Sequence, residues 1–516
     1  MIKDQKDSLF LLIKTLTKSE KRQFKLYVGR IEGNQDAKFL NLFNFLDKAV
    51  RYNEKDILST GIVKKQQLAN VKAHLYKQIL ISLKLNPLHQ NIRSQVREQT
   101  EFATILYHKG LYKQSLKLLD KAKELALNHE EKSLVYEVVE LEKLIESQYI
   151  TRSIESRADD LIAQSNAVSD LNVIAGKLSN LSLKLYSIIL KSGYVKNDEE
   201  KTQVLTYFEN NLPDFDIKSL GFREKLWLYN SNLWLSFLIQ DFAACYKYSK
   251  KWVELFQDFP KMITLNPVWY LKGNQYLLES LFYIQDHKRF EAVLEELEAN
   301  ILSKSFPKDD NIEGLVFLYL NTDKLNLCFM KGLFEEGLAL VDGILKGIKR
   351  YRNRIDEHHV MVFYYKIASL HFCVGNNKEC IRFLNFIISN KSLSMREDLM
   401  CFSRILSLFA HYDAGMDYHL ETQLKSTYKF LIKMNELNEV QTEIINFLKQ
   451  LPDIYPHDLK SAFQTTLEKL KNYEDDPFER RAFLYLDIIS WLESKIHNKP
   501  VNQIIRNKFL NRTAQD

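Results

Sequence analysis

The residues with the clearest potential for chemistry form one short run, Asp356-Glu357-His358-His359. Carboxylates and imidazoles are the side chains that bind zinc and similar metals in proteins. Neighbouring residues of a helix point about 100° apart, however, so one helix face cannot easily present all four groups to a metal. Acidic residues also stabilise the positive end of a helix dipole. We therefore interpret this run as the start of a helix and expect no metal site.

Two other pairs contain groups that enzymes use. His371 precedes Cys373, and a thiol beside an imidazole can act as a nucleophile. His411 precedes Asp413. No third, orienting group is visible for the cysteine pair, and both histidines come just before predicted turns. A histidine with a hydrogen-bond partner in the core or the turn is the simpler interpretation of each.

The sequence also lacks the motifs that bind phosphates or catalytic zinc. It has neither a glycine-rich phosphate loop nor a His-Glu-x-x-His motif. We therefore expect no enzymatic activity, no catalytic residue and no cofactor.

The densest local feature is a stripe of aromatic residues between positions 227 and 269. In one interpretation the rings form the core between packed helices. In the other, part of the stripe lines a concave groove that binds an apolar or extended peptide. The stripe consists of Trp227, Tyr229, Trp234, Phe237, Phe242, Tyr246, Tyr248, Trp252, Phe256 and Trp269.

A groove of this kind would take its side chains from the first helix of each pair in a stack of helix pairs, because these helices form the inner face. Six residues fall at such positions. The candidates for a partner-binding groove are Tyr229, Asn230, Asn232, Tyr276, Asn326 and Tyr365.

An internal repeat predicts the paired helices that would position these residues. The segment Lys109–Asp120 recurs as Lys331–Asp342, and in both copies a helical apolar pattern comes before and after the glycine. The repeat predicts a helix, a tight turn and a second helix packed against the first. Such turns fall near positions 110, 152, 193, 240, 288, 332, 375 and 415, a spacing of roughly 40–48 residues that is typical of two-helix repeats.

The order of glycine, aromatic, small, apolar and small residues resembles the tetratricopeptide repeat at Leu106–Ala122, Leu325–Ile344 and Tyr364–Ile387. The helices are longer than that family's usual unit, and its closing proline is mostly missing. The segment Leu16–Tyr27, together with the repeats, also looks like an uncharacterised bacterial family of about 500 residues, which implies no activity. The expected fold is all-α, a right-handed α-solenoid of about eight tetratricopeptide-like hairpins between helical N- and C-terminal caps.

We expect three parts along the chain: a basic N-terminal cap domain (1–90), the repeat solenoid (91–435), and C-terminal capping helices with a basic tail (436–516). In the first part, helices are predicted over Asp7–Leu16, after a capping box at Thr17–Glu20, over Ala37–Val50 and over Lys64–Leu85. Residues 53–61 are predicted to be a linker, and Pro87 marks the first boundary.

The last part is predicted to contain a helix over Leu437–Leu451 and a final pair over Ala462–Tyr473 and Phe478–Ile496. The basic tail after Pro500 is expected to fray.

Charge is uneven along the chain. Residues 1–100 contain 19 Lys and Arg against 9 Asp and Glu, a net +10, and the whole chain carries +6, so the remainder carries −4. The excess admits two interpretations, an anionic partner such as nucleic acid or a solvated lysine-rich helix surface. The residues that could contact an anion are Lys64, Lys65, Lys72 and Lys77.

The five cysteines form no Cys-x-x-Cys pair and lie in apolar segments, as expected of buried residues in a reducing compartment. No apolar run of about 18 residues occurs, and the N-terminus does not resemble a signal peptide, so we expect a cytoplasmic protein without a membrane span.

The function expected is a scaffold or adaptor that binds a protein or peptide on a concave surface. The alternative is a regulator whose basic N-terminal segment contacts nucleic acid while the repeats sense a partner.

Overall fold

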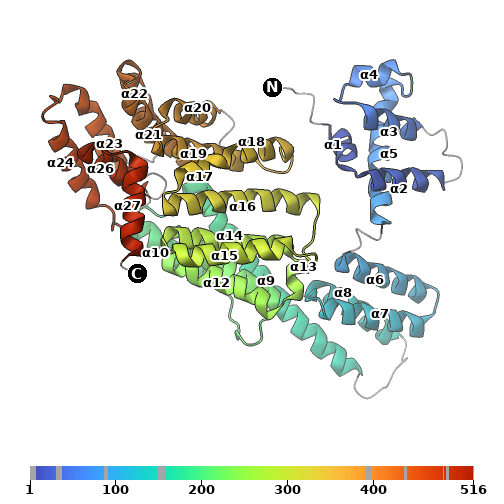
Figure 1. Cartoon of the computed structure of the whole chain (residues 1–516). Coiled ribbons are helices and arrows are strands. Elements are labelled where there is room, and N and C mark those ends of the chain that lie inside the picture. The colour runs from blue at the N-terminus through green and yellow to red at the C-terminus, as the bar shows by residue number, and fades with distance from the viewer. Residues whose placement is uncertain are drawn as a thin grey trace. The chain divides into compact units, whose positions relative to one another are not determined.

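The computed structural model of the chain is helical throughout the part it describes. Within the described residues all regular structure is helical and no strand occurs (Figure 1), which confirms the all-α class. The described residues are 7–30, 38–86, 91–148, 157–390, 397–434, 439–479, 482–483 and 487–514.

The chain divides into two compact units, unit 1 (Met1–Ser169) and unit 2 (Asp170–Asp516). This division is coarser than the three expected parts. Both expected boundaries, after residues 90 and 435, fall at segments outside the described residues, as does the turn expected near 152.

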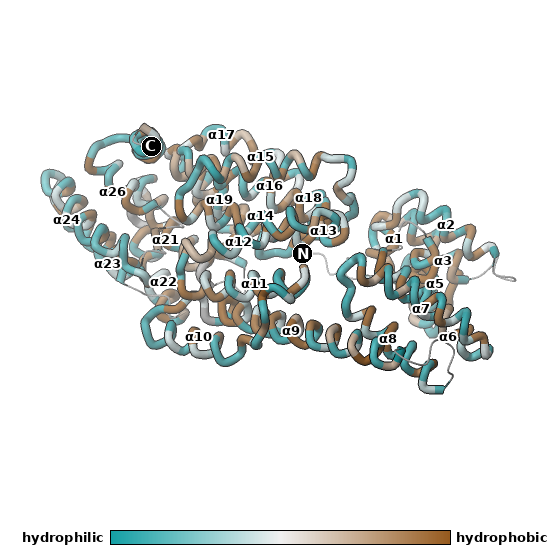
Figure 2. Tube along the Cα trace, turned by 90° about the horizontal axis from the view of Figure 1, so that it is seen from below, coloured by the Kyte–Doolittle hydropathy of each residue, from teal (hydrophilic) through white to brown (hydrophobic). Residues whose placement is uncertain are grey.

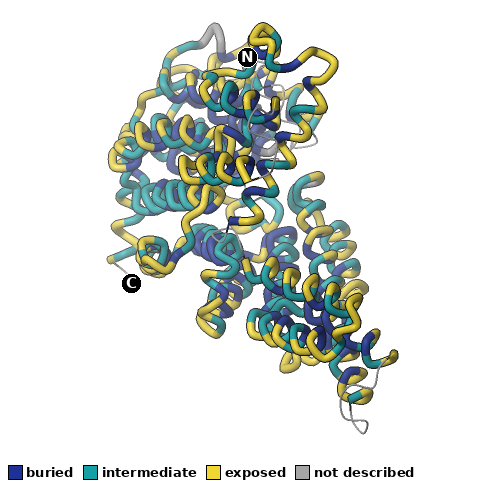
Figure 3. The backbone as a smooth tube through the Cα atoms, turned by 90° about the vertical axis from the view of Figure 1, so that its right-hand side faces the viewer, coloured by how far each residue is buried: buried dark blue, intermediate teal, exposed yellow. Residues whose placement is uncertain are grey.

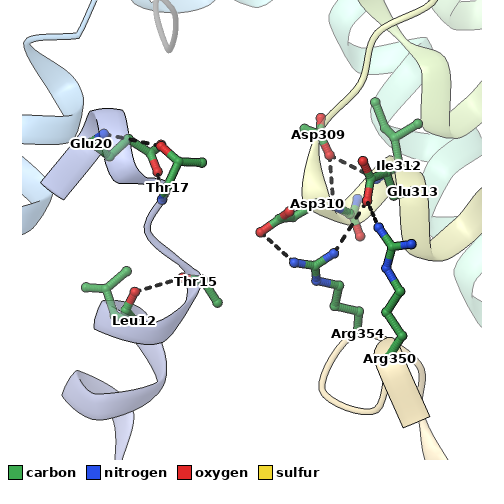
Figure 4. Close-up of polar contacts among 11 residues, drawn as sticks. Leu12, Thr15, Thr17, Glu20, Asp309, Asp310, Ile312, Glu313, Arg350 and Arg354 are labelled. Carbon is green, nitrogen blue, oxygen red and sulfur yellow. Dashed lines mark hydrogen bonds and ion pairs between the residues drawn. The ribbon is translucent and has the colours of Figure 1, made fainter. Parts of the chain in front are cut away.

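Unit 1 begins with five helices around one apolar core. They are α1 (Ser8–Thr15), α2 (Lys18–Gly29), α3 (Lys38–Lys48), α4 (Glu54–Ser59) and α5 (Lys65–Lys84). The expected capping box at the start of α2 is present: Thr17 Oγ1 accepts from the Glu20 amide, and Glu20 Oε2 accepts from the Thr17 amide (Figure 4). The core contains fully buried Ile13, Phe43 and Leu75.

The prediction that residues 53–61 are a linker is wrong, because they contain the short helix α4. Asn53 caps this helix by accepting from the Lys55 amide, and Ile57 is fully buried in the core. A single apolar side chain in a polar stretch gives no helical periodicity, so the sequence pattern missed it.

Unit 1 continues with α6 (Ile92–His108), α7 (Tyr112–Leu127) and α8 (Lys132–Gln148). These helices share a second apolar core, which includes Ala103, Leu119 and Val138. The fully buried carboxylate of Glu142 on α8 lies 2.6 Å from Nζ of Lys123 on α7 and 3.0 Å from Nη2 of Arg157.

The long helix α9 (Arg157–Ser192) corrects a second expectation. The sequence pattern indicated one helical segment through Ala158 and Ile162 and another over Leu178–Leu190, whereas these residues belong to one helix. Helix α9 contains one glycine, Gly176, and no proline, so no residue interrupts its backbone hydrogen bonds.

By length and composition, residues 157–191 are also the one candidate membrane span among the described residues. A core helix passes the same test, so this finding assigns no membrane.

Unit 2 is a succession of helices in which each packs against those next in order (Figure 1). Figure 2 shows apolar residues recurring along these helices, and Figure 3 shows buried positions recurring in the same way. After α9 come α10 (Asp198–Asn211), α11 (Phe222–Leu238), α12 (Phe242–Asp258), α13 (Lys261–Leu265), α14 (Pro267–Tyr283), α15 (His287–Leu302), α16 (Asp310–Lys331), α17 (Phe334–Ala339), α18 (Val341–Arg350), α19 (Glu357–Cys373), α20 (Asn377–Ile388), α21 (Glu397–Asp413), α22 (Asp417–Met434), α23 (Glu439–Gln450), α24 (Leu459–Lys471), α26 (Ile488–His497) and α27 (Val501–Thr513).

The turns inside the helix pairs share one hydrogen-bonding pattern. A residue with positive φ ends the first helix, and the amide after it donates to the carbonyl five residues earlier, as in a Schellman motif. Among the described residues the motif occurs eight times, at Gly110, Gln240, Gln285, Gly332, Gly375 and Gly415, and also at Glu130 before α8 and Asn498 before α27. The glycines predicted to lie at bends are therefore confirmed there. The turn expected at His287–Lys288 comes earlier, because α15 already begins at His287.

The C-terminal tail is helical and packed, which corrects the expectation that it frays. Helix α27 buries Val501 and Ile504 and lies against the end of α16. Arg506 Nη1 donates to the Lys331 carbonyl over 2.6 Å, and Lys508 pairs with Glu493 over 2.8 Å. The apolar residues of the tail are too few to stand out in the sequence.

Two other C-terminal expectations need adjustment. In place of the first turn of the helix expected over Phe478–Ile496, residues 477–479 form a turn held by the Asp476 carboxylate. Ala482 and Phe483 are helical, α26 begins at Ile488, and residues 480–481 and 484–486 lie outside the described residues. The helix expected over Leu437–Leu451 is α23, followed by a 3₁₀ turn at Leu451–Asp453.

Gly332 should be more sensitive to substitution than Gly375, although both have positive φ. An added Cβ at Gly332 would lie 3.0 Å from the Arg506 backbone, whereas one at Gly375 would meet nothing within 4 Å. We expect Gly375→Ala to cost about 1–2 kcal/mol through backbone strain. Gly332→Ala should cost about 1 kcal/mol more in urea unfolding and accelerate hydrogen exchange in α27. Equal effects of the two variants would show that α27 does not pack there.

The Glu142 carboxylate should stabilise unit 1. Replacing it by an amide leaves Lys123 and Arg157 charged without their partner, so we expect Glu142→Gln to lower the free energy of opening by about 3 kcal/mol. Native-state hydrogen exchange in α7 and α8 measures this change. Glu137→Gln on the exposed face of α8 is the control, with an expected effect below about 0.5 kcal/mol. Similar exchange in both variants would contradict the assignment.

Candidate functional site

Unit 2 contains a cavity of about 730 Å³ whose wall is built mainly by first helices of consecutive pairs. Side chains of α11, α14, α16 and α19 line it, and α9 and α27 contribute further residues. Asp309 fixes the start of α16 by accepting from the amides of Asn311 and Ile312, and Arg354 pairs with Asp310 beside it (Figure 4). Most of the lining residues lie on helices, which favours a preorganised site.

Aromatic rings make up one wall of the cavity. Trp234 lies with its ring centre 4.7 Å from that of Tyr186 and 5.4 Å from that of Tyr276. Phe237 and Tyr283 extend the same surface, with ring centres 6.3 Å apart. These rings pack on one another and also line the cavity. Of the aromatic stripe, Trp234, Phe237 and Phe242 lie in the cavity wall.

A polar network crosses three consecutive first helices. Gln275 of α14 donates from Nε2 to Asp323 Oδ1 of α16 over 3.3 Å. Lys366 of α19 donates to Asn326 Oδ1 of α16 over 2.6 Å. Also on α14, the Tyr283 hydroxyl donates to Glu279 Oε1 over 2.7 Å.

Burial changes the acidity of these groups. Removal from water holds the pKa of Asp323 well above its ordinary value and lowers the pKa of Lys366 to about 8, although Asp323 and Glu279 favour the charged lysine. Burial also raises the pKa of Tyr319 to about 12 and that of Tyr276 well above its ordinary value. Both phenols are therefore neutral at physiological pH.

The structure places three of the six expected groove residues in the cavity wall: Tyr276, Asn326 and Tyr365. The other three do not line it. Asn230 is buried and accepts from Ser182 over 2.6 Å, Asn232 donates to the Leu228 carbonyl of its own helix, and Tyr229 packs in the core near Lys251. Along α11, the residues that line the cavity are Trp234 and Phe237.

The four lysines expected to contact an anion do not form one patch. Lys72 bonds to Asp7 and to the Tyr52 hydroxyl, which neutralises it within unit 1. Lys64 precedes α5, and Lys65 and Lys77 are exposed. Twelve residues separate Lys65 from Lys77, which places their side chains about 120° apart around the helix.

Of the residues considered for metal binding or catalysis, Asp356 and His359 form a helix cap and Cys373 is partly buried. Asp356 caps α19 by accepting from the His359 amide and also bonds to the His359 ring, as the interpretation of a helix start predicts. Within the described residues no group of His, Cys, Asp and Glu could hold a metal ion. Burial raises the pKa of Cys373 well above its ordinary value, the opposite of an activated nucleophile.

Sequence reasoning missed the charged members of the polar network, Glu279, Asp323 and Lys366. A signal was present: Asp323 and Lys366 each precede by nine residues the positive-φ glycine of their own pair, Gly332 and Gly375. If the sequences of the helix pairs are aligned on the glycines of their turns, Asp323 and Lys366 fall at the same position of otherwise apolar first helices.

The lowered pKa of Lys366 can be measured by NMR titration of lysines labelled with ¹³C at Cε, with assignment by Lys366→Arg. We expect a pKa of about 8. Asp323→Asn should lower it further, because the Asp323 charge favours the ammonium form. Lys324, which is half-exposed beside Glu298, is the internal reference. A Lys366 pKa near 10.5, or one indifferent to Asp323, would contradict the described network.

No protein-family model matches the chain, and no curated protein matches its sequence. The function therefore has to be inferred from the cavity itself.

Proposed function

We propose that unit 2 binds a segment of a partner protein or a peptide in the cavity between α11, α14, α16 and α19. The observation that carries this proposal is the combination of an aromatic wall with a few polar groups in a cavity of about 730 Å³. Ligand sites are commonly apolar cavities of roughly 300–1,000 Å³ with few polar groups that orient the ligand. Aromatic side chains offer a binding partner large contact areas at little cost in conformational entropy.

We also propose that the helix pairs of unit 2 form a right-handed solenoid of tetratricopeptide-like hairpins. The support is the recurrence of one turn motif at Gln240, Gln285, Gly332, Gly375 and Gly415, with spacings of 45, 47, 43 and 40 residues. A recurrent pair of helices that shares its apolar faces with its neighbours is the physical basis of such arrays. We propose as well that the chain belongs to the uncharacterised bacterial family of about 500 residues that it resembles.

A scaffold or adaptor role in the cytoplasm, without a catalytic step, a cofactor or a membrane, completes the proposal. The alternative, contact with nucleic acid by the N-terminal segment, is supported only by the excess of positive charge, and Lys72 is already paired within unit 1. We therefore favour the protein or peptide partner.

Selection of 12-residue peptides displayed on phage, with the full chain as bait, tests this proposal. Enriched peptides should lose affinity at least tenfold for Tyr276→Ala, which removes part of the aromatic wall, and for Val362→Arg, which fills the cavity. Circular dichroism and thermal melting report whether each variant folds.

Leu302→Arg is the control, because Leu302 is exposed at the end of α15 and does not line the cavity. It should bind the peptides as the unchanged chain does. Failure to enrich any peptide, or equal binding by the folded cavity variants and the control, would overturn the proposal.

A further inference from the structure

We propose that the cavity receives a basic side chain, arginine or lysine, from the bound segment, at a subsite formed by Gln275, Tyr276 and Tyr319 in front of Asp323. This inference rests on the proposed binding of a peptide segment in unit 2. It adds the chemistry by which the cavity would select that segment.

The positions along the helices define this subsite. On α16, Tyr319, Asp323 and Asn326 follow one another at helical spacing and so share a face. Asp323 is bonded to Gln275, whereas Asn326, about one turn further along α16, is bonded to Lys366. We call Gln275 and Asp323 the first level and Asn326 and Lys366 the second; the charge of Lys366 still acts on Asp323.

Two hydrogen-bond acceptors at the first level are unused. Among the described residues, neither Asp323 Oδ2 nor Gln275 Oε1 has a hydrogen-bond partner, although both atoms are buried. A buried acceptor without a partner loses the hydration it would have in the unfolded chain. Gln275 lines the cavity, and fully buried Asp323 lies behind it. A rotation of the Gln275 side chain would bring its amide oxygen to a ligand group rich in N–H donors.

The charges around the cavity also favour a cation. Asp323 and Glu279 place two carboxylates in this network, and Lys366 is its one ammonium group. Lys366 is held between the rings of Phe282 and Phe329, at 5.9 and 5.8 Å from their centres. Burial favours the neutral form of Asp323, and a ligand cation in front of it would favour the ionised carboxylate, whereas an acidic ligand would be repelled by Glu279 in the cavity wall.

The rings of the subsite suit the same occupant. Tyr276 and Tyr319 line the cavity together with Tyr186, and the raised pKa values of Tyr276 and Tyr319 keep their phenols neutral. Neutral aromatic faces attract guanidinium and ammonium groups, most strongly where water is excluded. Apart from Lys366 and two histidines, the basic residues of the cavity wall are Lys508 and Arg512. Lys508 is paired with Glu493.

Five pools of nine-residue peptides, acetylated and amidated at their ends, test the inference by fluorescence anisotropy with the full chain. The central residue is arginine, lysine, citrulline, glutamate or leucine, and the flanking residues are randomised over neutral amino acids. Citrulline has the shape of arginine without its charge. We expect the arginine pool to bind about tenfold more tightly than the citrulline pool, and the glutamate pool to bind most weakly.

Glu279→Gln and Asp323→Asn should each reduce the preference for arginine over citrulline severalfold. Glu295→Gln on the exposed face of α15 removes the same charge outside the cavity and should leave the ratio unchanged. Thermal melting shows whether Asp323→Asn folds, and Glu279→Gln tests the same charge balance if it does not.

The two proposals fail in different ways. Pools that bind with equal affinity whatever their central residue, or that favour glutamate, would overturn the basic subsite and leave peptide binding intact. An arginine preference that persists in folded Glu279→Gln and Asp323→Asn would also overturn it. Absence of binding by every pool, together with a failed phage selection, would remove the proposed function itself.

Discussion

The structure depends on the inability of two short helices to bury their apolar sides by themselves. A helix pair closed by a tight turn leaves apolar surface on both outer sides, and a neighbouring pair must cover it. In unit 2, α12 accordingly packs on α14, α15 on α16, and α20 on α21. The turn fixes how the second helix returns, so a residue that accepts positive φ is required at the end of the first helix.

This constraint also explains where the polar residues lie. First helices of consecutive pairs, such as α14 and α16, pack side by side in the wall of the cavity, and polar side chains on that side can bond from helix to helix. Gln275 reaches Asp323 in this way, and Lys366 reaches Asn326. Such a network is costly unless each member is bonded, and Gln275 Oε1 and Asp323 Oδ2 have no hydrogen-bond partner among the described residues, which is why we propose a ligand group beside them.

The sequence predicted the helical class and most turns because glycine carries a strong local signal. Gly332, Gly375 and Gly415 end first helices as expected. Gln285 takes the same conformation without being glycine, and the turn there was placed a few residues late. The continuous α9 and the packed α27 were missed because local pattern does not report tertiary contacts, such as that between Arg506 and the end of α16.

The site was predicted in part for a related reason. Tyr276, Asn326 and Tyr365 lie in the cavity wall, whereas Tyr229, Asn230 and Asn232 do not, since an error of one or two residues in helix phase turns a side chain away. The charged residues Asp323 and Lys366 were overlooked because a single charge in an apolar helix resembles an exposed position until its neighbours are known.

Hydroxyl-radical footprinting with a selected peptide tests most directly whether the inner side of unit 2 is the binding surface. The account predicts that the peptide protects Tyr186, Tyr276 and Tyr319 in the cavity wall and leaves exposed Leu302 of α15 and exposed Phe386 of α20 as reactive as before. Protection of Leu302 or Phe386, with the three tyrosines unchanged, would contradict it.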